Sequence, residues 1–74
     1  MNQFEPQIEE RIAVITDNGK GGTIELNRIS FNGHPAKLDL RKWYNGQPQR
    51  GLGLTDAEAA ILYSVLQKYL NKGD

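Results

Sequence analysis

Apolar and polar residues alternate along Lys37–Tyr44, the most informative stretch of the chain. Alternation is the pattern of a β-strand, because successive side chains point to opposite faces. Leu38 and Leu40 share one face, which we expect to be buried. The other face carries charges and a large ring, in the order Lys37, Asp39, Arg41 and Trp43. We expect this second face to be exposed; the alternative is that the Trp43 ring half covers a small core.

Two strands are expected before this stretch. Ile8–Thr16 contains an unbroken run of mostly branched apolar residues, typical of a strand covered on both faces, with a short helix as second choice. In Thr23–Phe31 the apolar residues change parity midway. A bulge near Asn27 or Arg28 would reconcile the two halves. Without the bulge, Phe31 becomes a second exposed ring.

Glycine, proline and asparagine mark the turns. Residues 17–22 contain Asn-Gly, the strongest short hairpin signal. They lack the spacing of a Walker phosphate loop, so Lys20 is at most a peripheral backbone contact. Residues 32–35 form the next turn, where we expect His34 to be solvated. Residues 45–49 are a polar loop whose proline and glycine end the strand ladder, and a short fourth strand follows over 50–54.

A helix is predicted from Thr55 to about Asn71. Thr55 and Glu58 have the spacing of a capping box, in which each side chain bonds the other residue's backbone N–H. The helix carries a broad apolar stripe, consisting of Ile61, Leu62, Val65, Leu66, Tyr69 and Leu70. A stripe this wide needs two partners, for which we expect the apolar face of the sheet and the same helix of a second subunit. The alternative is that the chain's own curved sheet covers it all.

The elements together predict an α+β fold, in which a curved four-stranded antiparallel sheet precedes one C-terminal helix. Residues 1–74 form a single domain, with residues 1–7 as a loose lead-in. A domain this small buries only about 60% of its unfolded surface. Without cysteine, and with His34 as its one histidine, it has neither disulfides nor a zinc site to compensate. We therefore expect a homodimer.

The charge is unevenly distributed although the formal net charge is zero. Between residues 20 and 50 only Glu25 and Asp39 are acidic. The basic residues of this segment are Lys20, Arg28, Lys37, Arg41, Lys42 and Arg50. Cations interleaved with aromatic rings are what a single-stranded nucleic acid requires, because cations bind phosphates and rings stack on bases.

Other classes of protein are disfavoured by what the sequence lacks. It shows no cysteine, histidine dyad, paired catalytic carboxylates or nucleotide loop, so we expect no enzyme, cofactor, metal or small-molecule substrate. Neither a membrane span nor a signal peptide is visible, so we expect a cytoplasmic protein without a membrane partner.

The order of elements and several motifs resemble a known family. Residues 38–44 and 50–55 resemble the single-stranded-DNA-binding domain of the eukaryotic transcriptional coactivator positive cofactor four. Residues 26–33 match the Leu-Asn, two residues, Ser, aromatic, Asn-Gly pattern of its small bacterial YdbC-type branch. The likeness covers roughly residues 8–70. It departs at Gly53, where the family usually has a polar residue, and lacks the basic, serine-rich tail of the eukaryotic relatives.

This resemblance implies a homodimer that binds single-stranded DNA with little sequence preference, in transcription or in replication and repair. The implied binding residues are Lys20, Arg28, Phe31, Lys37, Arg41, Trp43, Tyr44 and Arg50, with Trp43 and Tyr44 as alternative stacking rings. The helix forms the implied dimer interface through Ile61, Leu62, Val65, Leu66 and Tyr69. Two alternatives are a dimeric protein-interaction module in transcription and single-stranded RNA binding, which uses the same chemistry. Arg41 could instead form a salt bridge with Asp39 or Glu25.

Overall fold

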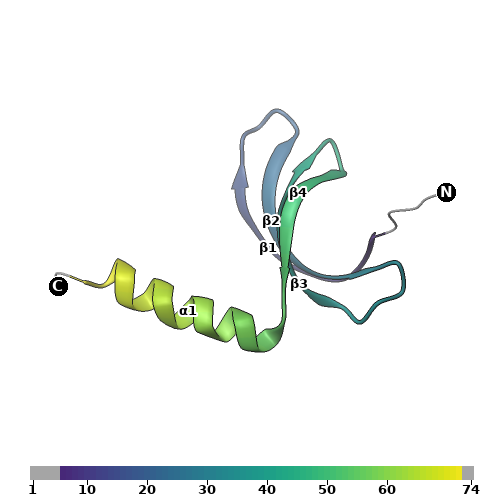
Figure 1. Cartoon of the computed structure of the whole chain (residues 1–74). Helices are drawn as coiled ribbons and strands as arrows, with labels where there is room; N and C mark the ends of the chain where they lie inside the picture. Colours follow the sequence, from purple (N-terminus) through teal and green to yellow (C-terminus); the bar gives the residue numbers. More distant parts are fainter. Residues whose placement is uncertain (1–5, 73–74) are drawn as a thin grey trace.

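The chain forms a four-stranded antiparallel sheet followed by one helix, in a computed structural model that describes residues 6–72 (Figure 1). The strands pair in chain order. The elements are β1 (Pro6–Asp17), β2 (Gly22–Phe31), β3 (Lys37–Tyr44), β4 (Gln47–Leu54) and α1 (Asp56–Leu70). The expected α+β layout is confirmed, including a strand rather than a helix at the start, but β1 is a largely exposed edge strand and not one covered on both faces. Residues 1–5 of the lead-in lie outside the described residues, and Pro6 and Gln7 already belong to β1, so the lead-in is shorter than predicted.

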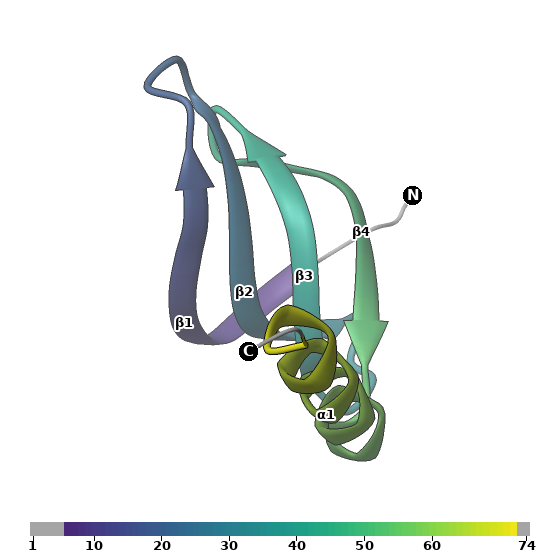
Figure 2. The same cartoon turned by 90° about the vertical axis from the view of Figure 1, so that its left-hand side faces the viewer.

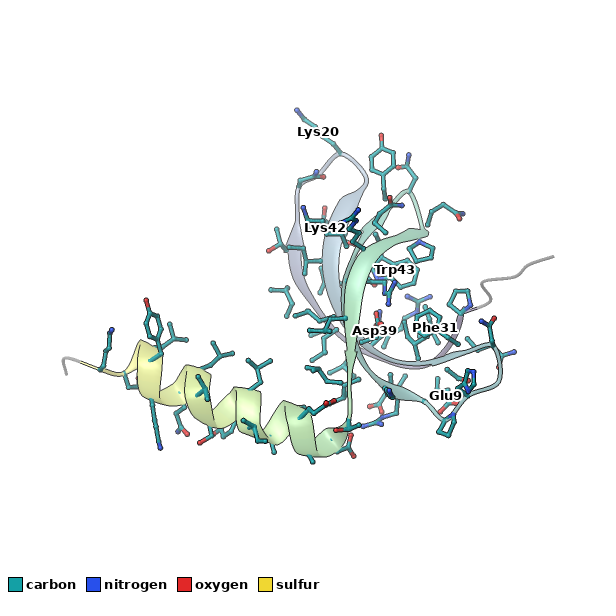
Figure 3. All side chains as sticks on the ribbon, viewed as in Figure 1. Glu9, Lys20, Phe31, Asp39, Lys42 and Trp43 are labelled. Carbon is teal, nitrogen blue, oxygen red and sulfur yellow. The ribbon has the colours of Figure 1, made fainter. Side chains whose placement is uncertain are left out.

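The sheet is strongly curved and has an inner and an outer face. Strands β2 and β3 pair without interruption, with Asn27 opposite Asp39 and Leu26 opposite Leu40. Figure 3 shows Phe31, Asp39 and Trp43 inside the curve and Lys42 on the other side of β3. Alternation then assigns the remaining residues of both strands. The inner face consists of Thr23, Glu25, Asn27, Ile29 and Phe31 with Lys37, Asp39, Arg41 and Trp43, and the outer face of Gly22, Ile24, Leu26, Arg28 and Ser30 with Leu38, Leu40, Lys42 and Tyr44.

The bulge predicted near Asn27 or Arg28 is wrong, because the β2–β3 register is continuous there. The irregularities lie in the ladders of the two edge strands instead. The pairing of β1 with β2 shifts at three places between residues 8 and 16, and that of β4 with β3 shifts once, between Arg41 and Trp43. An edge strand has one neighbour, so it can take up extra residues as the sheet bends without disturbing a second ladder. Phe31 therefore stays on the opposite face from Ile24 and Leu26.

Four of the five buried residues in β2 and β3 lie on the inner face, with Ser30 as the exception, which reverses the prediction for β3. Ile29 is 1% exposed and Trp43 7%, whereas Leu38 and Leu40 on the outer face are half-buried. Curvature explains the difference, because side chains inside the curve converge and cover one another, while those outside diverge. Alternation alone cannot show in which direction a sheet bends.

Strand β4 begins earlier than the sequence suggests. Asn45 and Gly46 form a tight turn with φ of 50° and 81°, the left-handed conformation that an Asn-Gly hairpin requires. Pairing resumes at Gln47, and Pro48 lies opposite Trp43 within the ladder. The predicted loop over 45–49 is therefore wrong. Because β4 is an edge strand, a proline there need not cost a ladder hydrogen bond.

The helix begins at the predicted cap and then projects away from the sheet (Figures 1 and 2). The Thr55 hydroxyl accepts from the Glu58 N–H at 3.1 Å, and the Glu58 carboxylate accepts from the Thr55 N–H at 2.8 Å. At its start, Arg28 of the sheet forms a salt bridge with Asp56 at 3.1 Å. No residue within Asp56–Leu70 is buried, so the expectation that the chain's own sheet covers the helix is wrong. Within residues 6–72, α1 is also too short and polar to span a membrane.

Candidate nucleic-acid interface

A hollow of about 300 Å³ opens on the inner face beside the turn that joins β2 to β3. We call it the inner hollow, and it is lined by Ile29, Phe31, His34, Lys37, Arg41 and Gly53, together with Pro35 and Asp39. It brings together Phe31, Lys37 and Arg41, three of the binding residues that the resemblance implies. Lys37 is exposed, and no residue within 6–72 forms a salt bridge with it.

Arg41 is held by an internal ion pair with Asp39. Its Nε and Nη2 atoms each donate to one carboxylate oxygen of Asp39 at 2.6 Å. Nη1 donates to the Gln49 carbonyl oxygen at 3.0 Å. Asp39 is 1% exposed, so Arg41 neutralises a charge that would otherwise be costly to bury. The alternative reading, a salt bridge with Asp39, is the one the structure shows.

The guanidinium of Arg41 also forms part of the wall of the inner hollow. Its Cζ atom lies 4.8 Å from the centre of the Phe31 ring, within the range of a cation–π interaction. Gly51 of β4 permits this placement, because a Cβ there would overlap the Cβ of Arg41. Arg41 therefore orients the ring rather than offering a free cation to phosphates.

Trp43 is not the exposed stacking ring that the sequence suggested. Its side chain lies on the inner face, opposite Thr23 and Pro48, and the residue is 7% exposed. The indole N–H has no hydrogen-bond acceptor among the described residues. Packing with these neighbours therefore holds the ring. The alternative in which Trp43 covers a small core is the correct one.

Tyr44 differs from its neighbour in both face and exposure. It is 55% exposed and belongs to the outer face, as does the exposed Lys42. Of the two rings that the sequence left as alternatives, Tyr44 is the accessible one, but it does not share a face with Phe31 and Lys37.

The remaining implied cations occupy three different environments. Lys20 projects from the tip of the β1–β2 turn (Figure 3), where Asn18 Oδ1 accepts from the Lys20 and Gly22 N–H groups at 2.7 and 3.0 Å. These bonds are those of an ordinary turn. Arg50 is exposed on β4. Arg28 is engaged with Asp56 at the start of α1, so its charge is already balanced.

The residues implied for the dimer interface are all exposed in the single chain. Ile61 is 66% exposed, Leu62 39%, Val65 56%, Leu66 45% and Tyr69 60%. At 100° per residue they span about 140° of the helix circumference. An apolar arc this wide on a helix of a soluble domain is normally covered.

Sequence reasoning missed the two glycines of β4 and the residues of the turn that frame the inner hollow. The sequence placed Gly51 and Gly53 in a short fourth strand and indicated only a solvated turn residue at His34. Their role depends on cross-strand register, which places Gly51 beside Arg41 and Gly53 beside Asp39. The alternation of β4 would have been the available signal, had its pairing with β3 been known.

Within residues 6–72, no three side chains of the metal-ligating types gather closely enough to hold an ion. The side chains of the inner face include rings, an amide, cations and two carboxylates, those of Glu25 and Asp39.

Comparison with known proteins identifies a relative of this chain but does not indicate its function. No protein-family model matches the sequence. An uncharacterized protein of Treponema pallidum (strain Nichols) is 31% identical over 70 residues, which make up 95% of this chain and 80% of that protein. Identity over nearly the whole chain includes both the sheet and the helix. The chain therefore belongs to the same family as this uncharacterized Treponema pallidum protein.

Proposed function

We propose that the chain binds single-stranded nucleic acid, DNA in the first instance, on the inner face of its sheet and with little sequence preference. The observation that carries the proposal is the inner hollow, which places an aromatic ring, Phe31, beside an exposed cation, Lys37, in a space that the chain leaves open. The resemblance to positive cofactor four and its YdbC-type relatives supports the same function. The proposal sets this activity in the cytoplasm, in transcription, replication or repair.

The chemistry requires two kinds of contact. Lys37, with the exposed Lys20 and Arg50, attracts the phosphates, while Phe31 offers a ring for a base. Each stacked base contributes on the order of 1 to 3 kcal/mol and is tolerated whatever its sequence, because every base has an aromatic face. A few such contacts in each of two linked copies reach nanomolar to micromolar affinity.

The same proposal includes a homodimer formed through α1. The apolar side chains of the helix are exposed in one chain, and the outer face of the sheet holds the half-buried Ile24, Leu26 and Leu40. Burying one large apolar side chain yields about 1.5–3 kcal/mol. Five from each copy are enough to offset the roughly 4–15 kcal/mol that association costs. A second copy would thus supply the cover that the single chain lacks.

The test compares two charge reversals on one strand. Lys37→Glu places an acid on the inner face, and Lys42→Glu makes the same change five residues later on the outer face. Anisotropy of a labelled oligothymidine reports the affinity, at several salt concentrations and with matching RNA and duplex. We expect Lys37→Glu to weaken binding at least tenfold and Lys42→Glu to change it less than twofold. For the wild type, log affinity should fall with log salt by about 0.7 for each phosphate contact.

Equal effects of the two reversals on affinity would show that the strand does not bind on the inner face. Failure of the wild type to bind any strand would contradict the proposed function. Tighter binding of the RNA strand would replace DNA with RNA as the ligand. Binding that is tighter to the duplex would remove the single-strand assignment.

A dimeric protein-interaction module in transcription is the second candidate, favoured by exposed apolar residues on the edge strand. Within β1, Ile12 is 41% exposed, Val14 60% and Ile15 58%. Exposed apolar side chains gathered on one segment are typical of protein contact sites. Absence of strand binding in the titration above, with the dimer intact, would support this candidate.

A further inference from the structure

We propose that the inner hollow accepts one nucleobase of the bound strand, inserted edge-on between the sheet and the β2–β3 turn. This inference rests on the proposed function and specifies how one nucleotide is held. At about 300 Å³ the inner hollow is at the small end of ligand sites, which suits a group of the size of a base. Ile29, 1% exposed, forms its floor.

The inner hollow stays open at Gly53 because that residue has no side chain. A Cβ built on Gly53 would have its nearest neighbours at 3.7 Å, the Cδ of Lys37, and at 3.9 Å, the carbonyl oxygen of Leu38. These are ordinary van der Waals distances, so the backbone would accept a larger residue. At Gly51, by contrast, an added Cβ would overlap Arg41. Gly53 is thus free to vary sterically, and a side chain there would occupy the inner hollow.

The lining favours a base over a phosphate group. Ile29, Phe31 and Pro35 supply apolar wall, and the charge of Arg41 is already balanced by Asp39. A phosphate inside would meet the buried Asp39 carboxylate, an unfavourable contact between like charges. Lys37 also lines the inner hollow, and because it is exposed its ammonium group can bind the phosphate of the inserted nucleotide on the solvent side. The apolar wall of the inner hollow would thus hold the base, and Lys37 would hold the charged phosphate.

Gly53→Leu tests the inference by filling the inner hollow, with Gly53→Ala as the matched control. Circular dichroism and sedimentation confirm that both variants keep the fold and the association state of the wild type. We expect Gly53→Leu to bind oligothymidine about tenfold more weakly, the loss of one stacked base, and Gly53→Ala, which fills less of the inner hollow, to lose less affinity than Gly53→Leu. In methyl-labelled wild type, the Ile29 methyl resonance should shift on titration and show contacts with thymine protons.

The inference is overturned if Gly53→Leu binds as tightly as Gly53→Ala and the Ile29 methyl resonance does not move. In that case the proposed function still stands, provided that wild type binds the strand and Lys37→Glu weakens it. Failure of wild type to bind any strand would instead remove the proposed function, and this inference with it. If Gly53→Leu alters the fold, the Ile29 resonance in wild type decides.

Discussion

Asp39 is a carboxylate in the most buried part of the sheet, and Arg41 two residues later provides its counter-charge. Both guanidinium contacts come from the same strand, so the pair forms within one inner-face row of β3. Removing one member of a buried pair leaves an uncompensated charge, which is far more costly than losing a surface salt bridge. The inner face therefore depends on Arg41 for its stability, whatever it binds.

Arg41→Ala should lower the free energy of unfolding by about 3 kcal/mol, because Asp39 is left buried without its partner. Lys37→Ala, on the same face but exposed, should change it by less than about 0.5 kcal/mol. Urea unfolding at one fixed protein concentration measures both. Similar values for the two variants would mean that Asp39 gains solvent or another partner on folding.

The alternation of side chains in β3 was predictable from the sequence, but which of the two faces is buried was not. The pattern correctly separated Leu38 and Leu40 from Asp39, Arg41 and Trp43. Burial was assigned to the wrong face, because hydrophobicity favours the leucines while curvature covers the inner side. Trp43 was consequently misplaced as an exposed ring. The Arg41–Asp39 pair was foreseen as an alternative because residues two apart on a strand share a face.

Helix α1 is the element that the sequence predicted most closely. Its capping box forms as expected, and the start of the helix agrees with the structure. Hydrogen bonds from the backbone N–H and then the side chain of Thr55, with the charge of Lys37, hold the pKa of Glu58 below its ordinary value. The folded state therefore favours the ionised carboxylate. The strand boundaries and the bulge were less predictable, because they depend on the curvature of the sheet and on pairing between strands.

Thr55→Ala should destabilise the protein by about 1 kcal/mol through loss of the cap. Ser64→Ala, an exposed site in the middle of the same helix, is the control and should be neutral or slightly stabilising. Thermal denaturation followed by circular dichroism at 222 nm distinguishes the two. A Thr55→Ala variant as stable as wild type would show that packing in the assembled protein replaces the cap.

Glu58 should make helix stability depend on pH in the acidic range. Because its pKa is lower in the folded state, its contribution is complete above the unfolded pKa and is lost as pH falls through the folded pKa. Glu58→Gln should remove this part of the acid dependence. Unfolding curves of both proteins between neutral and acidic pH measure the difference, and parallel curves would exclude a role for this carboxylate.

The whole chain places a helix with no buried residue beside a sheet whose outer face is only half-buried. The order of the elements followed from the sequence, but the direction of α1 did not, since an apolar stripe does not specify which surface covers it. The expected cover by the chain's own sheet is absent. The other predicted cover for the apolar stripe is the same helix of a second subunit, and this stays a prediction.

Leu66→Glu should convert a dimer to a monomer, because it places a charge within the proposed interface. Gln67→Glu introduces the same acid about 100° away on the polar side of the helix and should leave the mass unchanged. Light scattering coupled to gel filtration gives the mass of each variant. The monomer should also bind oligothymidine more weakly, since linked sites bind more tightly than single ones. A dimeric Leu66→Glu variant would locate the contact elsewhere.

The three register shifts of β1 limit how the protein can assemble. A regular edge strand presents an uninterrupted row of backbone hydrogen-bond donors and acceptors. A strand of another chain can pair with that row, and repeated pairing of this kind builds a filament. In β1 that row is broken three times within one strand, so a further molecule finds no matching template. The irregular register of β1 therefore disfavours the addition of a further strand, and with it filament growth, at this edge of the sheet.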